Sequence, residues 1–193
     1  EWQVVRHEDG RPAIFSSGEL HFSDTDPLLI TQNFLKEYGN LFGVKDEQVS
    51  VEKIFREGDI SQVFLQQLYD GNPIFGTRLN LVMNNHGDII YIVSDFYQSG
   101  IAPGNFLISP EQAAQISRNA IVKKWGPLVI DDPAFTVENL QSLEVKGYRS
   151  SNNKIVPVYQ WNLTSSSTIP TDTLIEVDAV QGICSILKST SRN

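Results

Sequence analysis

Residues 62–77 read QVFLQQLYDGNPIFGT and carry the pattern of a β-hairpin. Apolar residues alternate along the first part, with Val63, Leu65 and Tyr69 on one face and Phe64 and Leu68 on the other, which predicts a strand over residues 60–69. The segment 70–73, Asp-Gly-Asn-Pro, has the composition of a turn. Residues 74–83 alternate again, so we expect the chain to return as a second strand.

The segments on either side extend this hairpin into a larger unit. Val49 and Val51 begin an earlier strand, and residues 84–88 form a turn into a strand over 89–96. Upstream, an apolar stripe at helical spacing predicts a helix over residues 27–41, with Asp26 as its N-cap and Pro27 at its first position. The first half therefore predicts one helix on an antiparallel meander.

The second half repeats this order after a linker signal at residues 99–104, SGIAPG. Ser109, Pro110 and Gln112 form a capping-box start for a helix that ends before Gly126. Strands are expected over residues 140–148, 155–164, 173–179 and 183–187, with a polar hairpin at 150–153. The sequence thus predicts an α+β fold of two tandem units, each one helix packed on an antiparallel β-sheet.

Composition excludes several classes of function. The 193 residues contain 15 Lys and Arg against 23 Asp and Glu, a net charge of −8, which disfavours a nucleic-acid-binding protein. No apolar run reaches the roughly 18–20 residues of a membrane-spanning helix. The single cysteine, Cys184, permits no intrachain disulfide.

The sequence shows no catalytic motif. His7 and Glu8 begin a zinc-protease pattern, but Gly10 indicates a turn instead, and no Gly-x-Ser-x-Gly motif is present. Cys184 lies in an apolar strand pattern and is expected to be a structural thiol. Asp24 and Asp26 are explained by a turn and a helix cap, and the 84–88 segment with its histidine by a hairpin turn. We therefore expect no catalytic residue, no metal site and no cofactor in this chain.

The ordered motifs resemble a known family. Residues 34–44, FLKEYGNLFGV, and 62–77 are similar to the helix and the Gln-x-x-x-Gly-x-Pro-Val-Phe-Gly turn of the fungalysin/thermolysin propeptide. Residues 108–113, ISPEQA, 158–163, VYQWNL, and 175–183, IEVDAVQGI, resemble a PepSY domain, although Gln181 stands where Thr is usual. The resemblance implies two cystatin-like units, a propeptide-like domain at 1–100 and a PepSY-like domain with a C-terminal tail at 101–193.

Each motif residue also has a structural interpretation. Gly71 and Gly76 permit backbone angles that a Cβ would penalise, and Pro73 sets the exit of the turn. Gln67 or its neighbour Gln66 lies at a strand end, where its side chain can bond backbone of the turn. In the second half, Trp161 shares a strand face with other apolar residues. Asp178 can accept N–H bonds in its own tight turn, which Gly182 leaves.

The resemblance implies a propeptide of a secreted, thermolysin-like zinc metallopeptidase. Such a propeptide is an intramolecular chaperone and a non-covalent inhibitor of the catalytic domain of the same precursor, its partner, after autoprocessing. Zinc and calcium would then be bound by that catalytic domain, and a signal peptide would have been removed upstream. The polar tail, expected to reach the partner's cleft, comprises Ser189, Thr190, Ser191, Arg192 and Asn193. For the tail itself, the alternative is a plain frayed end, because any chain trimmed after its last strand leaves a polar tail of this kind. The alternative is a free-standing secreted binding or inhibitory module with no cognate downstream protease.

Overall fold

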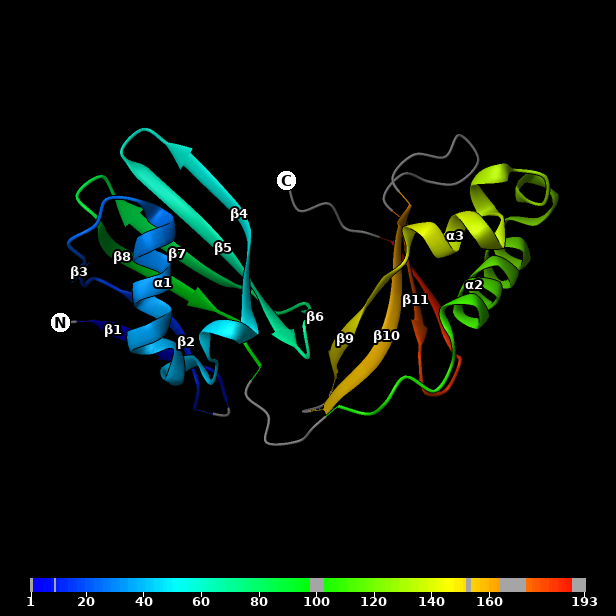
Figure 1. Ribbon diagram of the computed structural model, residues 1–193, viewed down its shortest axis with the longest axis horizontal. Coiled ribbons are helices and arrows are strands. Elements are labelled where there is room, and N and C mark those ends of the chain that lie inside the picture. The colour runs from blue at the N-terminus through cyan, green and yellow to red at the C-terminus, as the bar shows by residue number, and fades with distance from the viewer. Residues whose placement is uncertain (1, 9, 98–102, 152–153, 164–172, 189–193) are drawn as a thin grey trace. The chain divides into compact units, whose positions relative to one another are not determined.

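The computed structural model describes residues 2–8, 10–97, 103–151, 154–163 and 173–188. The chain divides into two compact units, Glu1–Gly100 and Ile101–Asn193. Each unit combines helices with an antiparallel sheet, which Figure 1 shows as coiled ribbons and arrows. The predicted α+β class, with a principal helix packed on an antiparallel sheet in each unit, is confirmed.

The sheet of the first unit is centred on its longest strand, β5. Its order is β1-β2-β8-β7-β5, with β4 on the other side of β5, β3 on β8 and β6 at the end of β5, and each of these pairs is antiparallel. The strands are β1 (Gln3–Arg6), β2 (Pro12–Ser16), β3 (Leu20–His21), β4 (Val49–Glu57), β5 (Ile60–Tyr69), β6 (Asn72–Phe75), β7 (Leu79–Asn84) and β8 (Asp88–Ser94).

The helix α1 (Pro27–Tyr38) begins and ends as local sequence dictates. The carboxylate of Asp26 accepts the Leu28 N–H at 2.8 Å, and Pro27 occupies the first turn, where its missing N–H costs no bond. The helix passes into the short 3-10 helix η1 (Gly39–Phe42), which stops at Gly43 with a φ of 69°. The α-helix therefore ends at Tyr38, three residues before the predicted end at residue 41.

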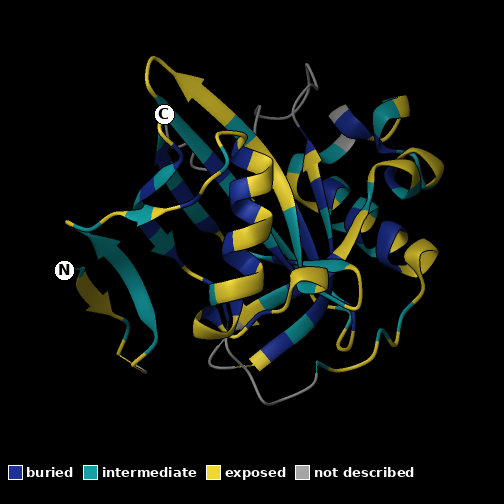
Figure 2. Cartoon of the chain, turned by 60° about the vertical axis from the view of Figure 1, so that its left-hand side comes forward, coloured by how far each residue is buried: buried dark blue, intermediate teal, exposed yellow. Residues whose placement is uncertain are grey.

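The core of the first unit lies between α1 and one face of the sheet. Ile30 and Phe34 of α1 are each 1% exposed, and they face strand residues such as Val63 and Leu81, which are fully buried. Figure 2 shows this division on α1, whose buried inner side is dark blue and whose outer side is yellow. Alternation in β5 and β7 places the remaining residues of those strands on the opposite face.

In the described residues of the second unit, the sheet has the strand order β9-β10-β11-β12, and neighbouring strands are again antiparallel. Its strands are β9 (Val145–Ser151), β10 (Lys154–Leu163), β11 (Thr173–Asp178) and β12 (Cys184–Lys188). The helices are α2 (Pro110–Trp125) and α3 (Val137–Leu143), and the 3-10 helices η3 (Gly126–Val129) and η4 (Pro133–Phe135) connect them.

The helix α2 packs small residues against the sheet. Ala113, Ala114 and Ile121 are fully buried, and they belong to one cluster with Ile175 and Val177 of β11. The capping box at its start is complete: the Gln112 N–H bonds the hydroxyl of Ser109, and the Ser109 N–H bonds the Gln112 side chain at 2.8 Å. Small helix residues let the helix axis approach the sheet closely.

Two predicted strands are wrong in part. The expected strand over residues 74–83 is two strands, β6 and β7, because Gly76 has a φ of +80° and the Thr77 N–H turns back to the Ile74 carbonyl at 3.3 Å. The expected strand over 140–148 is the end of α3 followed by β9. The Thr136 hydroxyl caps α3 by accepting the Asn139 N–H, so the segment begins as a helix.

Candidate functional site

The Gln67 side chain fastens the end of the first unit's sheet to a later part of the chain. It is 5% exposed, its Nε2 donates to the Tyr97 carbonyl at 2.7 Å, and its Oε1 accepts the Tyr97 N–H at 2.7 Å. One amide thereby satisfies both backbone groups of a buried residue 30 positions away. Gln67 is a structural clamp in this arrangement, because both polar atoms of its side chain bond the backbone of Tyr97.

The neighbouring Gln66 holds the turn that follows. Its Nε2 donates to the Ile74 carbonyl at 2.7 Å and lies 3.1 Å from the Thr77 hydroxyl. Gly71 and Gly76 both have positive φ, +71° and +80°, in the left-handed region where a Cβ is strained. The motif of the first unit therefore shapes a backbone turn.

Asp178 organises the corresponding turn of the second unit. Its carboxylate accepts the N–H groups of Val180 and Gln181, each at 2.8 Å, and its own backbone bonds both Gly182 and Ile183 at 2.9 Å. Gly182 has a φ of +67°. The turn is closed internally by these bonds.

Trp161 links the sheet of the second unit to α3. The indole is fully buried, and its Nε1 donates to the Leu140 carbonyl at 2.7 Å. Within each unit, the motif residues thus lie in backbone turns or, for Trp161, in the core. The proposed partner-binding tail, Ser189, Thr190, Ser191, Arg192 and Asn193, lies outside the described residues.

The histidines are dispersed and take part in local contacts. His7 donates from Nε2 to the Ser94 carbonyl at 2.9 Å, and His21 Nδ1 lies 2.6 Å from the Asp88 carboxylate. Hydrogen bonding from Asn84, and then from His21, lowers the pKa of Asp88 below its usual value. Among the described residues, no group of three or more His, Cys, Asp or Glu side chains is placed to hold a metal ion.

Cys184 is a half-buried thiol in β12, beside the second core. Burial raises its pKa to about 11, so the neutral thiol dominates at pH 7. A nucleophilic cysteine requires the opposite shift, and the side chain is therefore a packing residue.

Glu176 is a buried charge that sequence reasoning missed. It is 3% exposed, one carboxylate oxygen lies 3.0 Å from Arg149 Nη1, and the other accepts from Gln160 Nε2 at 2.7 Å. The three residues come from β9, β10 and β11, and only the strand register brings them together. A charge that is paired and hydrogen-bonded in this way is a structural element of the sheet.

A groove in the first unit lies between α1 and β4. It has a volume of about 600 Å³, and its floor includes the buried Leu35 and Leu65. Leu28, Gln32 and Lys36 line it from α1. On the opposite wall it is lined by Asp46, Glu47, Val49, Ser50 and Val51. Sequence periodicity gives no sign of this groove, because it depends on how far α1 extends across the sheet.

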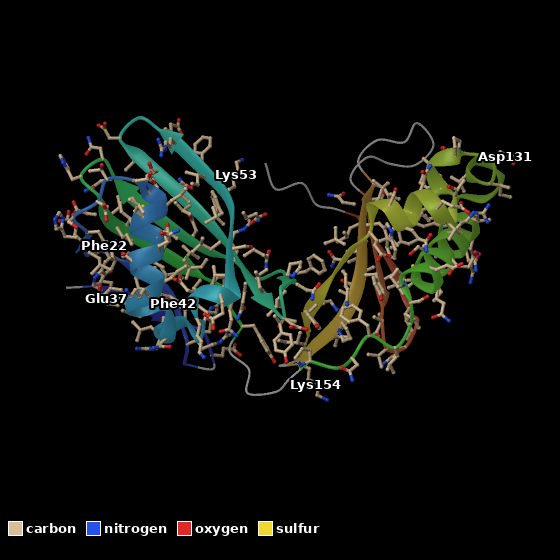
Figure 3. The ribbon with its side chains drawn as sticks, in the orientation of Figure 1. Phe22, Glu37, Phe42, Lys53, Asp131 and Lys154 are labelled. Atoms are coloured by element: carbon tan, nitrogen blue, oxygen red, sulfur yellow. The ribbon has the colours of Figure 1, made fainter. Side chains whose placement is uncertain are left out.

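A smaller apolar pocket of about 140 Å³ lies near the end of α1. Its lining is aromatic and aliphatic and consists of Trp2, Phe15, Leu20, Phe34, Tyr38, Leu41, Phe42 and Ile92. The Trp2 ring meets Phe15 edge-on at 6.1 Å and covers Gly18, where a Cβ would lie 2.5 Å from the indole. The labelled Phe42 in Figure 3 marks this end of the unit. A volume of this size accommodates about one apolar side chain, well below the roughly 300–1,000 Å³ of small-molecule sites.

The chain's likeness to known proteins is weak. No family model matches it, and no curated protein matches it. Among solved structures it is similar to the Bacillus megaterium YpeB C-terminal domain, with 12% identity and a TM-score of 0.46 over 97% of this chain and 75% of that one. A likeness at this level leaves family and function unassigned. No helix in the described parts is long and apolar enough to span a bilayer.

Proposed function

We propose that this chain is a non-catalytic protein-binding module and, more specifically, the N-terminal propeptide of a secreted zinc metallopeptidase. The groove between α1 and β4 is the observation that supports a protein-binding module. Its lining combines exposed apolar side chains, two carboxylates and a strand edge, and includes neither a histidine nor a cysteine. Such a surface suits a polypeptide partner.

The proposal that the chain is a propeptide rests on the sequence motifs. The propeptide-like and PepSY-like segments occur in the order that the resemblance requires, and their key residues build turns and cores. Motif residues that build turns and cores fit a scaffold that offers a surface to a folding partner. Inhibition by such a scaffold needs no chemistry from this chain, because zinc and its ligands belong to the catalytic domain.

The distribution of charge supports an acidic binding unit. Residues 1–100 contain 15 Asp and Glu against 7 Lys and Arg, whereas residues 101–193 contain 8 of each, so the whole net charge of −8 belongs to the first unit. An acidic surface speeds association with a partner that carries positive charge near its contact face. The alternative remains a free-standing secreted module, which would use the same surface without a cognate protease.

An inhibition and refolding assay tests the proposal. The peptidase domain that the proposal expects after Asn193 is denatured and then diluted into buffer with and without purified 1–193, and peptidase activity is followed. We expect the chain to raise the yield of folded enzyme and to inhibit the folded enzyme in stoichiometric amounts. A chain that does neither would contradict the propeptide function, and a coding frame without a peptidase domain would favour the free-standing module.

A further inference from the structure

The two halves of the open edge of β4 differ in how well they are protected against pairing with a strand of another chain. Exposed strand edges attract other chains, and proteins commonly protect them with bulges and charged residues. In β4 the register shifts between Val51 and Lys53, and the residues beyond this bulge include Lys53, Arg56 and Glu57. The first half, Val49–Ser50–Val51, has neither device. Figure 3 places Lys53 on β4, on the protected side of this division.

The unprotected half is the half that borders the groove. Val49, Ser50 and Val51 line it, whereas no residue of β4 beyond the bulge does. β4 pairs with β5, and among the described strands of this unit no other strand covers its second edge. Figure 2 shows β4 as a largely exposed strand beside α1. A strand added here would point alternate side chains toward the groove between β4 and α1.

The groove has an apolar floor and an acidic end. Leu28 and Val51 are 42% and 44% exposed, although both are apolar, and they flank the buried Leu35. Asp46 and Glu47 are exposed, and no ion pair joins either of them to another described residue. Glu52 differs, since it pairs with Arg78 at 2.9 Å.

We propose that an extended segment of a partner protein adds to β4 at Val49–Val51 as a short antiparallel or parallel strand. Its groove-facing residues are apolar and cover the Leu28–Val51 surface. A basic residue of the same segment lies beside Asp46 and Glu47, where the lining has two carboxylates against the single ammonium of Lys36. The choice of a cationic partner follows from this local excess of acid and from the acidic charge of the whole unit. The inference extends the binding-module proposal by naming its contact strand.

Synthetic peptides on the full chain test the inference. The probe is acetyl-KVKVKV-amide, followed by amide NMR shifts, with acetyl-EVEVEV-amide and a KVKVKV peptide methylated at alternate backbone nitrogens as controls. We expect KVKVKV to shift the amides of Val49–Val51 and to slow their hydrogen exchange. The acidic peptide and the methylated peptide should bind at least tenfold more weakly. Shifts scattered over the acidic surface, equal binding of the methylated peptide, or no binding at millimolar peptide would each overturn the proposal.

A matched pair of variants localises the contact. Val51→Lys and Phe55→Lys alter residues of the same strand that are 44% and 43% exposed, so neither disturbs the core. We expect Val51→Lys to weaken KVKVKV binding more than tenfold, and Phe55→Lys to change it less than twofold. Glu47→Lys should weaken it roughly fivefold. Equal losses in the Val51 and Phe55 variants would refute strand addition beside the groove.

The propeptide function and the strand addition at β4 can be refuted independently of each other. The peptide assay uses no protease, so a chain that inhibits its peptidase but ignores KVKVKV disproves only the contact strand. A chain that binds the peptide at Val49–Val51 but neither refolds nor inhibits a downstream peptidase disproves only the propeptide function.

Discussion

Replacing Gln67 tests the clamp at the end of the first unit. Gln67→Met keeps nearly the same length and volume but removes both hydrogen bonds to Tyr97. Gln67 and Tyr97 are 5% and 8% exposed, so water does not freely replace the lost partners. Each buried backbone group left without a partner costs about 1–3 kcal/mol, which gives a loss of about 2–6 kcal/mol for the pair.

The loss is large against the stability of a single domain, which is about 5–15 kcal/mol. We therefore expect the first unit to unfold at a lower urea concentration, while the second unit is unchanged. Backbone NMR follows the two units separately, and hydrogen exchange of the Tyr97 amide reports the broken bond directly. Gln62→Met is the control, since Gln62 lies on the same strand, is half-buried, and its side chain makes no hydrogen bond to another described residue.

The isosteric change Gln67→Glu adds a pH signature. The protonated carboxyl can still donate to the Tyr97 carbonyl, whereas the carboxylate cannot, and burial also favours the neutral form. The folded-state pKa of the introduced carboxyl is thus raised above its unfolded value of about 4.3. Its stabilising contribution is fully present below that unfolded value and is lost as the pH rises through the folded-state pKa.

An unchanged urea midpoint and Tyr97 exchange rate in Gln67→Met would refute the clamp.

Two further substitutions and one labelling experiment probe the second unit. Trp161→Phe removes the donor to the Leu140 carbonyl and leaves a small void. We therefore expect the free energy of unfolding of this unit, measured in urea, to fall by about 2–4 kcal/mol. A fall below about 0.5 kcal/mol would contradict the role of the indole. Gly182→Ala places a Cβ at a φ of +67°, with Ile116 Cδ1 at an ordinary 3.5 Å, so backbone strain of about 1–2 kcal/mol should lower the same midpoint. An unchanged midpoint would show that the turn relaxes without cost. Native Cys184, with a pKa of about 11, should react with iodoacetamide at pH 7 more than tenfold more slowly than in urea. Equal rates would show an accessible thiol whose pKa is not raised by burial.

Local signals in the sequence predicted the parts of the fold that depend on neighbouring residues. The caps at Asp26 and Ser109 and the turn at Asp178 all involve partners within a few positions, and the alternation that predicts β5 lies within the strand's own residues. The N-cap at Thr136 has the same kind of local signal, but the apolar residues from 140 onward favour a strand by their spacing. Gly76 likewise marks the break between β6 and β7.

The remaining features depend on residues that are distant in sequence. The Gln67 clamp joins residues 30 positions apart, and the buried Glu176 finds Arg149 and Gln160 only through the strand register. The groove beside β4 reflects the placement of α1 on the sheet, which helical periodicity does not determine. The strands β1, β2 and β3 were also not predicted, since they are short and their half-exposed residues give weak alternation.

The most direct test of the propeptide function is an autoprocessing measurement on the coding frame extended past Asn193. The precursor is expressed with and without a zinc chelator, and its cleavage is followed by intact mass. We predict one cut close to Asn193 that the chelator abolishes, and co-elution of 1–193 with the released peptidase. Two results would contradict the account if the frame encodes a zinc peptidase. In the first, cleavage of the precursor proceeds unchanged in the presence of the chelator. In the second, the released 1–193 elutes alone and does not inhibit the peptidase.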